Sequence, residues 1–162
     1  MVLGVLSDSH DNIWKLDLAL PHLCKAQVIL HCGDLCSPFV VKRMASGLRG
    51  RQIHIVWGNN DGDPLAIAGL ARAHAHVHLH GQLAELTFNG CRVAVNHYPP
   101  IALGLAKSGS YDLVCYGHDH HAKMEEVGDC ILLNPGELMG LEGKSMMALY
   151  DTESRLAEYI EL

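Results

Sequence analysis

The sequence lacks any long hydrophobic run, because charged residues, glycine or histidine interrupt each apolar stretch within a few positions. No stretch therefore resembles a transmembrane span, which needs about 20 mainly apolar residues. The first residues, Met1 to Leu6, are too short for the apolar part of a secretory signal and include no basic residue. We expect a cytoplasmic protein that does not enter a membrane, with a buried first strand at residues 1–7.

The sequence also has no Cys-x-x-Cys pair, although it contains six cysteines. In a chain without a signal peptide, we expect free thiols and no disulfides. Cys32 and Cys36 lie on either side of Asp34, so a thiolate metal site is an alternative for these two residues. We favour packing of strand and loop for both.

Positive charge is scarce as well. The chain has 12 Lys and Arg residues against 18 Asp and Glu residues, and its formal net charge is −6. This balance argues against binding to long nucleic acids, whose phosphates are neutralised by Lys and Arg. A small anionic substrate is still compatible with it if metal ions supply positive charge locally. Histidine, by contrast, is abundant, with 12 residues, and it is the commonest metal ligand in proteins.

The length of 162 residues, of which 49% are hydrophobic, suits a single domain over residues 1–162 with one substantial core. In the first half, short apolar runs alternate with segments of helical spacing. Strands that alternate with helices indicate a parallel sheet. We predict strands at 1–7, 28–30 and 53–57, and helices at 12–25, from Pro38 onward, and at 64–73.

The second half is richer in strands. Asn89-Gly90 separates two apolar runs and predicts a tight hairpin, because a type I′ turn requires positive φ at both central residues. The mixture predicts an α/β fold in which two sheets pack together with helices outside. We predict a helix at 100–107 and strands at 83–88, 91–96, 113–116, 122–127, 130–133, 145–150 and 155–161.

Candidate ligands follow five of the predicted strands, and in open α/β sheets ligands bind beyond the carboxyl ends of strands. Each motif alone has a plainer interpretation as a helix cap, an ordinary turn or a structural histidine. Two histidines two positions apart after a glycine are more specific for a metal. The motifs are Asp8-Ser9-His10, Gly33-Asp34, Gly58-Asn59-Asn60-Asp61, His97 and Gly117-His118-Asp119-His120.

In combination these motifs favour metal binding. Seven ligands are too many for one transition ion and about right for two ions that share a bridging carboxylate. Oxygen and imidazole ligands suit Mn, Fe, Zn, Co or Ni better than Ca. We expect two divalent metal ions, with manganese as the first choice and Fe, Zn, Ni or Co as alternatives. The candidate ligands are Asp8, His10, Asp34, Asn59, His97, His118 and His120.

The order D-x-H, G-D, G-N-x-D, a lone His and G-H-x-H resembles the calcineurin-like metallophosphoesterase superfamily over essentially the whole chain. The short length and Asn134-Pro135-Gly136 look like its small YfcE-like phosphodiesterase branch, which is also similar to the retromer subunit Vps29. The resemblance implies a four-layer αββα sandwich of two mixed β-sheets flanked by helices. It also implies that one metal is held by Asp8, His10, Asp34 and His120, and that Asp34 bridges to a second, completed by Asn59, His97 and His118.

The activity that this resemblance implies is hydrolysis of small phosphodiesters by a hydroxide that bridges the two metals. Asp34, Asn59 and His97 are then the expected catalytic residues. A non-catalytic, Vps29-like protein-binding scaffold and a phosphomonoesterase are the alternatives, and the sequence leaves a homo-oligomer open.

One departure from the superfamily pattern concerns Asn60. Many members have a histidine there that donates a proton to the leaving group, which an amide cannot do. We therefore expect aryl phosphodiesters, which have acidic leaving groups, to react better than alkyl ones. Asp61 and His121 are conceivable substitute donors, and Glu137 is expected at the pocket rim.

Some histidines lie outside these motifs. His31 precedes the Gly-Asp motif, and we expect it to form a hydrogen bond to a metal ligand. A strand through residues 74–80 would place its four alternating histidines on one face, either exposed, at a subunit contact or around a surface metal. These residues are His74, His76, His78 and His80.

Overall fold

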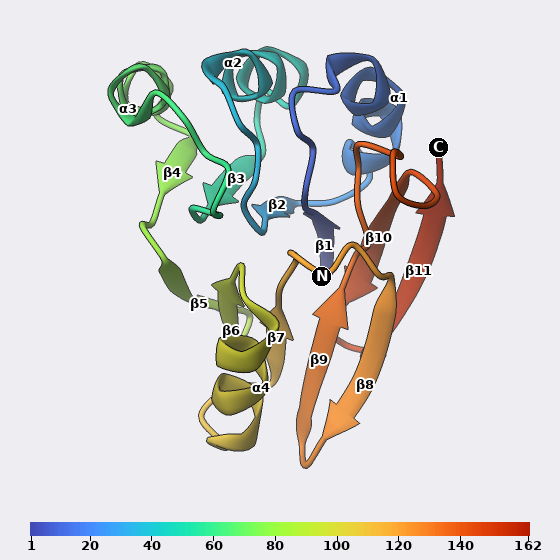
Figure 1. Cartoon of the computed structure of the whole chain (residues 1–162). Coiled ribbons are helices and arrows are strands. Elements are labelled where there is room, and N and C mark those ends of the chain that lie inside the picture. The colour runs from blue at the N-terminus through green and yellow to red at the C-terminus, as the bar shows by residue number, and fades with distance from the viewer.

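The structure is a computed structural model that describes residues 1–162 as a six-stranded and a five-stranded sheet with helices on their outer faces (Figure 1). The helices are α1 (Ile13–Leu23), α2 (Pro38–Gly47), α3 (Pro64–Arg72) and α4 (Pro99–Lys107). The strands are β1 (Val2–Leu6), β2 (Val28–His31), β3 (Gln52–Ile55), β4 (Val77–Leu79), β5 (Leu83–Phe88), β6 (Cys91–Asn96), β7 (Leu113–Cys115), β8 (Lys123–Val127), β9 (Cys130–Asn134), β10 (Met146–Asp151) and β11 (Leu156–Glu161).

Both sheets are mixed. The first has the order β11-β10-β1-β2-β3-β4, in which β1 to β4 are parallel and β10 and β11 are antiparallel to their neighbours. The second has the order β5-β6-β7-β9-β8, in which β6, β7 and β9 are parallel and each outer strand is antiparallel. Each sheet therefore contains a group of parallel strands whose carboxyl ends lie at one common edge of the sheet.

Three apolar clusters separate four layers. The largest lies between α1, α2 and α3 and the outer face of the first sheet, and it includes Leu16, Met44 and Ile53. A second cluster fills the space between the two sheets, and a third lies between the second sheet and α4. Figure 1 shows the three helices above the first sheet and α4 beside the second. The predicted four-layer αββα sandwich is confirmed.

Local sequence explains where several elements begin. The Asn12 side chain accepts a hydrogen bond from the Lys15 amide at the start of α1, and Ser37 and Asp63 cap α2 and α3, whose first residue is a proline. Asn89 and Gly90 both have positive φ, 48° and 84°, and join β5 to β6 as a tight hairpin. This hairpin is confirmed as predicted.

The histidine-rich segment differs from the expectation. Only Val77–Leu79 pairs with β3 and forms a strand. His74 and His76 lie in the preceding turn. A single strand through all four histidines is therefore not formed. The rings of His78 and His80 instead stack on His54 of β3, with centroids 4.8 and 5.0 Å away.

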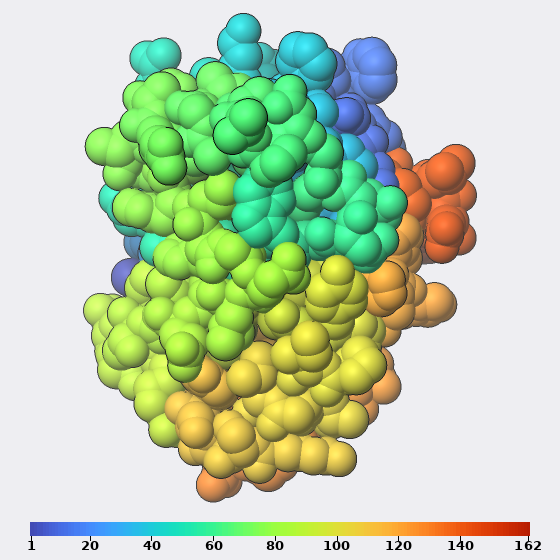
Figure 2. Space-filling model, turned by 60° about the vertical axis from the view of Figure 1, so that its left-hand side comes forward, coloured from blue at the N-terminus to red at the C-terminus, as the bar shows by residue number.

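The outer surface of this edge is continuous. Figure 2 shows the green surface of α3, β4 and β5 running from the upper half of the molecule to the lower half.

All six cysteines are free thiols, as predicted. None of the helices is both long and apolar enough to cross a membrane.

Candidate metal centre

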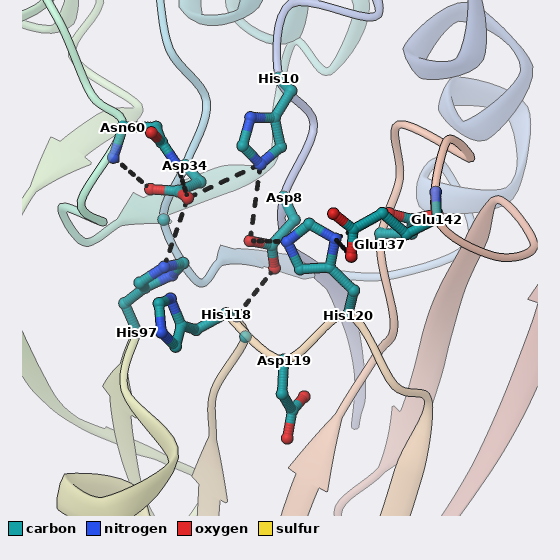
Figure 3. A network of polar contacts seen from close by, with 12 residues as sticks. Asp8, His10, Asp34, Asn60, His97, His118, Asp119, His120, Glu137 and Glu142 are labelled. Atoms are coloured by element: carbon teal, nitrogen blue, oxygen red, sulfur yellow. Dashed lines mark hydrogen bonds and ion pairs between the residues drawn. The ribbon is translucent and has the colours of Figure 1, made fainter.

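The seven candidate ligands lie in the loops that follow β1, β2, β3, β6 and β7, so both sheets contribute to one site (Figure 3). Five of their side chains form two groups whose ligand atoms lie within 4.8 Å of one another. One group is Asp8, His10 and His120, and the other is Asp8, Asp34 and His97. The two groups share the buried carboxylate of Asp8.

Asp34 belongs to the second group and also approaches His10 of the first. Its Oδ2 is 3.6 Å from His10 Nε2 and 3.5 Å from His97 Nε2. The Asn59 Oδ1 atom lies 3.1 Å from the same His97 nitrogen. One Asp34 oxygen therefore lies near histidines of both groups, and the bridging role that the resemblance implies for Asp34 stays a prediction.

His118 lies in the same site but outside these two groups. Its ring packs edge-on against His97, with centroids 5.1 Å apart, and its backbone amide donates to Asp8 Oδ2 at 3.1 Å. The residue lines the same cavity as His10, Asp34, Asn59 and His120. Its backbone thus fixes one ligand, while its side chain faces the shared space.

Strained backbone conformations aim these side chains. Five of the seven candidates have positive φ, which costs an L-residue about 1–3 kcal/mol each and persists where the surrounding structure enforces it. Such residues cluster at functional sites in proteins. The five are Asp8 (51°), His10 (39°), Asp34 (56°), His118 (74°) and His120 (60°).

Two motif glycines are required because other atoms approach them closely. A Cβ atom on Gly58 would lie 2.0 Å from Asp34 Oδ1, and one on Gly117 would lie 1.9 Å from Ser7 Oγ. Neither distance is compatible with a side chain. The glycines in the G-N and G-H motifs therefore allow the loops of different strands to meet at the site.

The donor set fits a cation. His97 Nδ1 lies 2.8 Å from the Cys32 carbonyl, which can only accept, so Nδ1 carries a proton, and Nε2 presents a lone pair when the ring is neutral. That lone pair faces the oxygens of Asp34 and Asn59, so three acceptors converge. A metal ion between them satisfies all three.

The same arrangement occurs at His120. Its Nδ1 lies 2.8 Å from the Glu137 carboxylate, which leaves Nε2 as an acceptor 3.3 Å from Asp8 Oδ1. Asp8 Oδ1 and His10 Nε2 are also buried atoms without a hydrogen-bond partner. Buried polar atoms are rarely left unpaired, and a shared cation accounts for both of them.

Electrostatics keep the two aspartates ionised. Burial alone would raise the pKa of Asp8, but contacts with His10, Ser7 and His97 outweigh it and lower the pKa. Burial likewise opposes ionisation of Asp34, and contacts with His97 and Asn60 lower its pKa well below the usual range. Both carboxylates are therefore available as anionic ligands at neutral pH.

Glu137 was expected at the pocket rim, and this expectation is wrong, because the side chain is 0% exposed. One carboxylate oxygen contacts His120 Nδ1, and the other accepts the amides of Glu142 and Gly143 at 2.8 and 2.6 Å. Metal-binding histidines typically donate their second nitrogen to such an acceptor. No pattern in the sequence indicated this contact.

The proposed substitute proton donors are not placed for that role. Asp61 accepts three backbone amides, from Asp34, Cys36 and Gly58, at 3.2, 2.8 and 2.7 Å. His121 is exposed and lies outside the residues that line the cavity. Asn60 itself donates both its backbone amide and its side-chain amide to Asp34, each at 2.8 Å.

Two further residues lie beside the ligands. His31 bonds Ser9 Oγ at 3.0 Å and the Gly33 amide at 3.2 Å, so it supports two motif loops, whereas the expected bond to a ligand side chain is not formed. Cys36 Sγ lies 3.4 Å from His10 Nδ1, and burial raises the pKa of its thiol to about 12. Cys32 is buried between the two sheets. Neither cysteine belongs to a candidate metal group.

A cavity of about 760 Å³ opens over the site. Its charged lining side chains include Asp11, Asp34 and Glu142, but no Lys or Arg. The site can therefore hold an anion only if bound cations supply the positive charge. The remaining lining residues are His10, Asn12, Trp14, Asn59, Asn60, His118, His120, Met139, Gly140 and Leu141.

Known proteins share this sequence pattern and fold. Residues 1–155 match the calcineurin-like phosphoesterase superfamily domain. The chain is 31% identical to phosphodiesterase MJ0936 of Methanocaldococcus jannaschii, over 100% of this chain and 98% of that protein. It is 29% identical to a structurally characterised archaeal phosphodiesterase, with a TM-score of 0.92 and complete coverage of both chains.

More distant solved structures share the fold. Vps29 of Entamoeba histolytica, solved with zinc, is 16% identical, with a TM-score of 0.71 over 99% of each chain. The phosphoesterase YfcE of E. coli is 17% identical, with a TM-score of 0.68 over 99% of this chain and 98% of that one.

Proposed function

Because the chain belongs to the calcineurin-like phosphoesterase superfamily, we propose that it is a phosphodiesterase that hydrolyses small phosphodiesters at a centre of two divalent metals. One observation carries this proposal: Nε2 of His97 and Nε2 of His120 face carboxylate oxygens of Asp34 and Asp8, and Asp8 Oδ1 and His10 Nε2 are buried without a hydrogen-bond partner. The name of the M. jannaschii relative supports a diester as the substrate.

We assign the first ion to Asp8, His10, Asp34 and His120, and the second to Asp34, Asn59, His97 and His118. Manganese is the first choice, with Fe, Zn, Ni or Co as alternatives that the same nitrogen and oxygen ligands accept. Two such ions would activate water and stabilise the negative charge of the phosphate during its displacement. Of the ligands, Asp34, Asn59 and His97 are the proposed catalytic residues.

Several residues of the chain hold this centre in place. Asn60 fixes the Asp34 carboxylate with two hydrogen bonds, and Asp61 ties the Asp34 loop to the Gly58 loop. Glu137 fixes the orientation and the proton position of His120. Metal ligands held in this way need little rearrangement when substrate binds.

The leaving group receives no obvious proton from the protein. Asn60 is an amide engaged with Asp34, and Asp61 accepts three backbone amides, so neither residue is free to act as an acid. General acid catalysis typically contributes about 10²–10⁴-fold. We therefore propose that the preferred diesters release a group that is stable as an anion, such as a phenolate.

The proposed partner is a small phosphodiester, and long nucleic acids are disfavoured by the formal net charge of −6. A cytoplasmic location is also proposed. Six free thiols support it, because reducing compartments keep cysteines unpaired.

The test is turnover of bis(p-nitrophenyl) phosphate before and after metal removal with EDTA. We expect EDTA to abolish turnover and added Mn²⁺ to restore it. Asp34→Asn is expected to remove most turnover, whereas Asp17→Asn, a change on the exposed face of α1, is a matched control that should not. Full turnover after EDTA, or in Asp34→Asn, would overturn the metal-centred proposal, whereas no turnover with any of the candidate metals would favour a binding scaffold.

A further inference from the structure

The apolar side chains of the cavity lie on one wall. Only three of its lining residues are hydrophobic, namely Trp14 from the first turn of α1, and Met139 and Leu141 from the loop between β9 and β10. Asn59 and Asn60 also line the cavity. Figure 3 shows Asn60 and Glu142, a neighbour of Leu141 in the loop, on opposite sides of the ligands.

This apolar wall is attached to the metal centre. The Asn12 side chain caps α1 and donates to the Met139 carbonyl at 2.8 Å, which joins the helix to the loop. The Met139 amide in turn donates to the Asp8 carbonyl at 3.0 Å. Glu137 holds the far end of the loop through the amides of Glu142 and Gly143. The position of the wall is therefore fixed relative to a proposed metal ligand.

The two outer side chains of this wall have few partners within the protein. Trp14 is 75% exposed and Leu141 is 81% exposed, although both face the cavity. An indole offers a large flat surface on which another ring can stack in an offset arrangement. A leucine beside it adds apolar contact without a directional requirement. Together they offer a surface that a flat ring would cover.

The charges of the cavity restrict what can bind on this wall. Asp11 and Glu142 lie in the lining, and no Lys or Arg is present there. A second anionic group on the substrate would be repelled by these carboxylates without any compensating side chain. The group that covers the wall is therefore uncharged or cationic, and the leucine favours an uncharged one.

We propose that Trp14 and Leu141 form a subsite for a flat, uncharged aromatic ring attached to the phosphodiester. The substrate class is then a mono-anionic diester with an aryl or nucleobase-bearing ester group. This inference rests on the proposed function, because the phosphate must be held by the metal centre for the ring to reach the wall. Trp14 is a specificity residue in this assignment and has no part in the chemical step.

The experiment measures Kd by calorimetry for two inert mono-anions, methyl phenylphosphonate and methyl methylphosphonate, on Mn²⁺-loaded protein. The two differ only in the ring. We expect the phenyl compound to bind about tenfold more tightly, which is the scale of one stacked ring. Trp14→Ala should remove that preference and Trp14→Phe should keep most of it. Leu18→Ala, an exposed change one turn further along α1 and outside the cavity, should leave it unchanged.

The outcomes separate the subsite from the metal centre. Equal affinity of the two phosphonates for the wild type, or an unchanged preference in Trp14→Ala, would overturn the subsite while leaving the phosphodiesterase proposal intact. Binding of both phosphonates that is unaffected by removal of Mn²⁺ would overturn the metal-centred proposal itself.

Discussion

Replacing Glu137 by glutamine should weaken metal binding, because this residue holds both His120 and the neighbouring loop. Its carboxylate accepts from His120 Nδ1 on one side and from the amides of Glu142 and Gly143 on the other. A glutamine has only one acceptor oxygen, so it loses one of these two sets of contacts and turns an NH₂ group toward a donor.

The magnitude follows from the contacts that are lost. Removing a buried acceptor behind a metal-binding histidine typically costs about 10–100-fold in metal affinity. We expect that range for Glu137→Gln. Glu137→Ala leaves all three donors without this acceptor, and each buried unpaired donor costs about 1–3 kcal/mol, so we expect a loss of at least about 3 kcal/mol in the free energy of unfolding.

The assay is calorimetric titration of metal-free protein with Mn²⁺, combined with urea unfolding of the same samples. Glu142→Gln is the matched control, because its carboxylate lies 3.6 Å from the same His120 nitrogen but is 69% exposed. We expect less than about a twofold change in affinity for this control, in line with the small contribution of exposed ion pairs. An unchanged Mn²⁺ affinity in Glu137→Gln would refute the positioning of His120 by Glu137.

Three other predictions test separate parts of the structure. Burial, with His80 and His78 nearby, lowers the pKa of His54 to about 4. Protonation of His54 is therefore less favourable in the folded than in the unfolded protein. The free energy of unfolding is at its full value above pH 6.5 and decreases as the pH falls toward 4. His54→Gln should flatten urea-measured stability over that range; an unchanged pH dependence contradicts this. Gly58→Ala should displace Asp34 and reduce Mn²⁺ affinity at least about tenfold, whereas Gly69→Ala, in an open part of α3, should stabilise the protein by about 0.5–1 kcal/mol. Aryl diesters should be hydrolysed about 10²–10⁴-fold faster than alkyl diesters, and comparable kcat values would reveal another proton donor.

Much of the fold could be predicted because it depends on local chemistry. The β5–β6 hairpin follows from Asn89-Gly90, whose two residues tolerate positive φ. The strand considered for residues 74–80 was too long, because only the three residues of β4 pair with β3. The histidines around it consequently pack with His54, which is distant in sequence, and a pattern read along one strand could not reveal this contact.

The candidate ligands could be located because parallel strands bring their carboxyl ends to common edges. Their supporting residues could not, because those contacts depend on loop conformation. Glu137 is 17 residues from His120, and Asn60 is 26 residues from the carboxylate that it holds. Asn60 was interpreted as standing in place of a proton donor, and it binds the proposed ligand Asp34. Glu137 was interpreted as a rim residue, and it binds the proposed ligand His120.

The central claim is that two metal ions share Asp34, and the most direct measurement is a crystal structure of Mn²⁺-soaked protein with anomalous diffraction at the manganese edge. We predict two anomalous peaks about 3.5–4 Å apart, with Asp34 in contact with both. The first should lie against Asp8, His10 and His120, and the second against Asn59, His97 and His118. A single peak, or two peaks of which only one contacts Asp34, would contradict the shared-carboxylate centre.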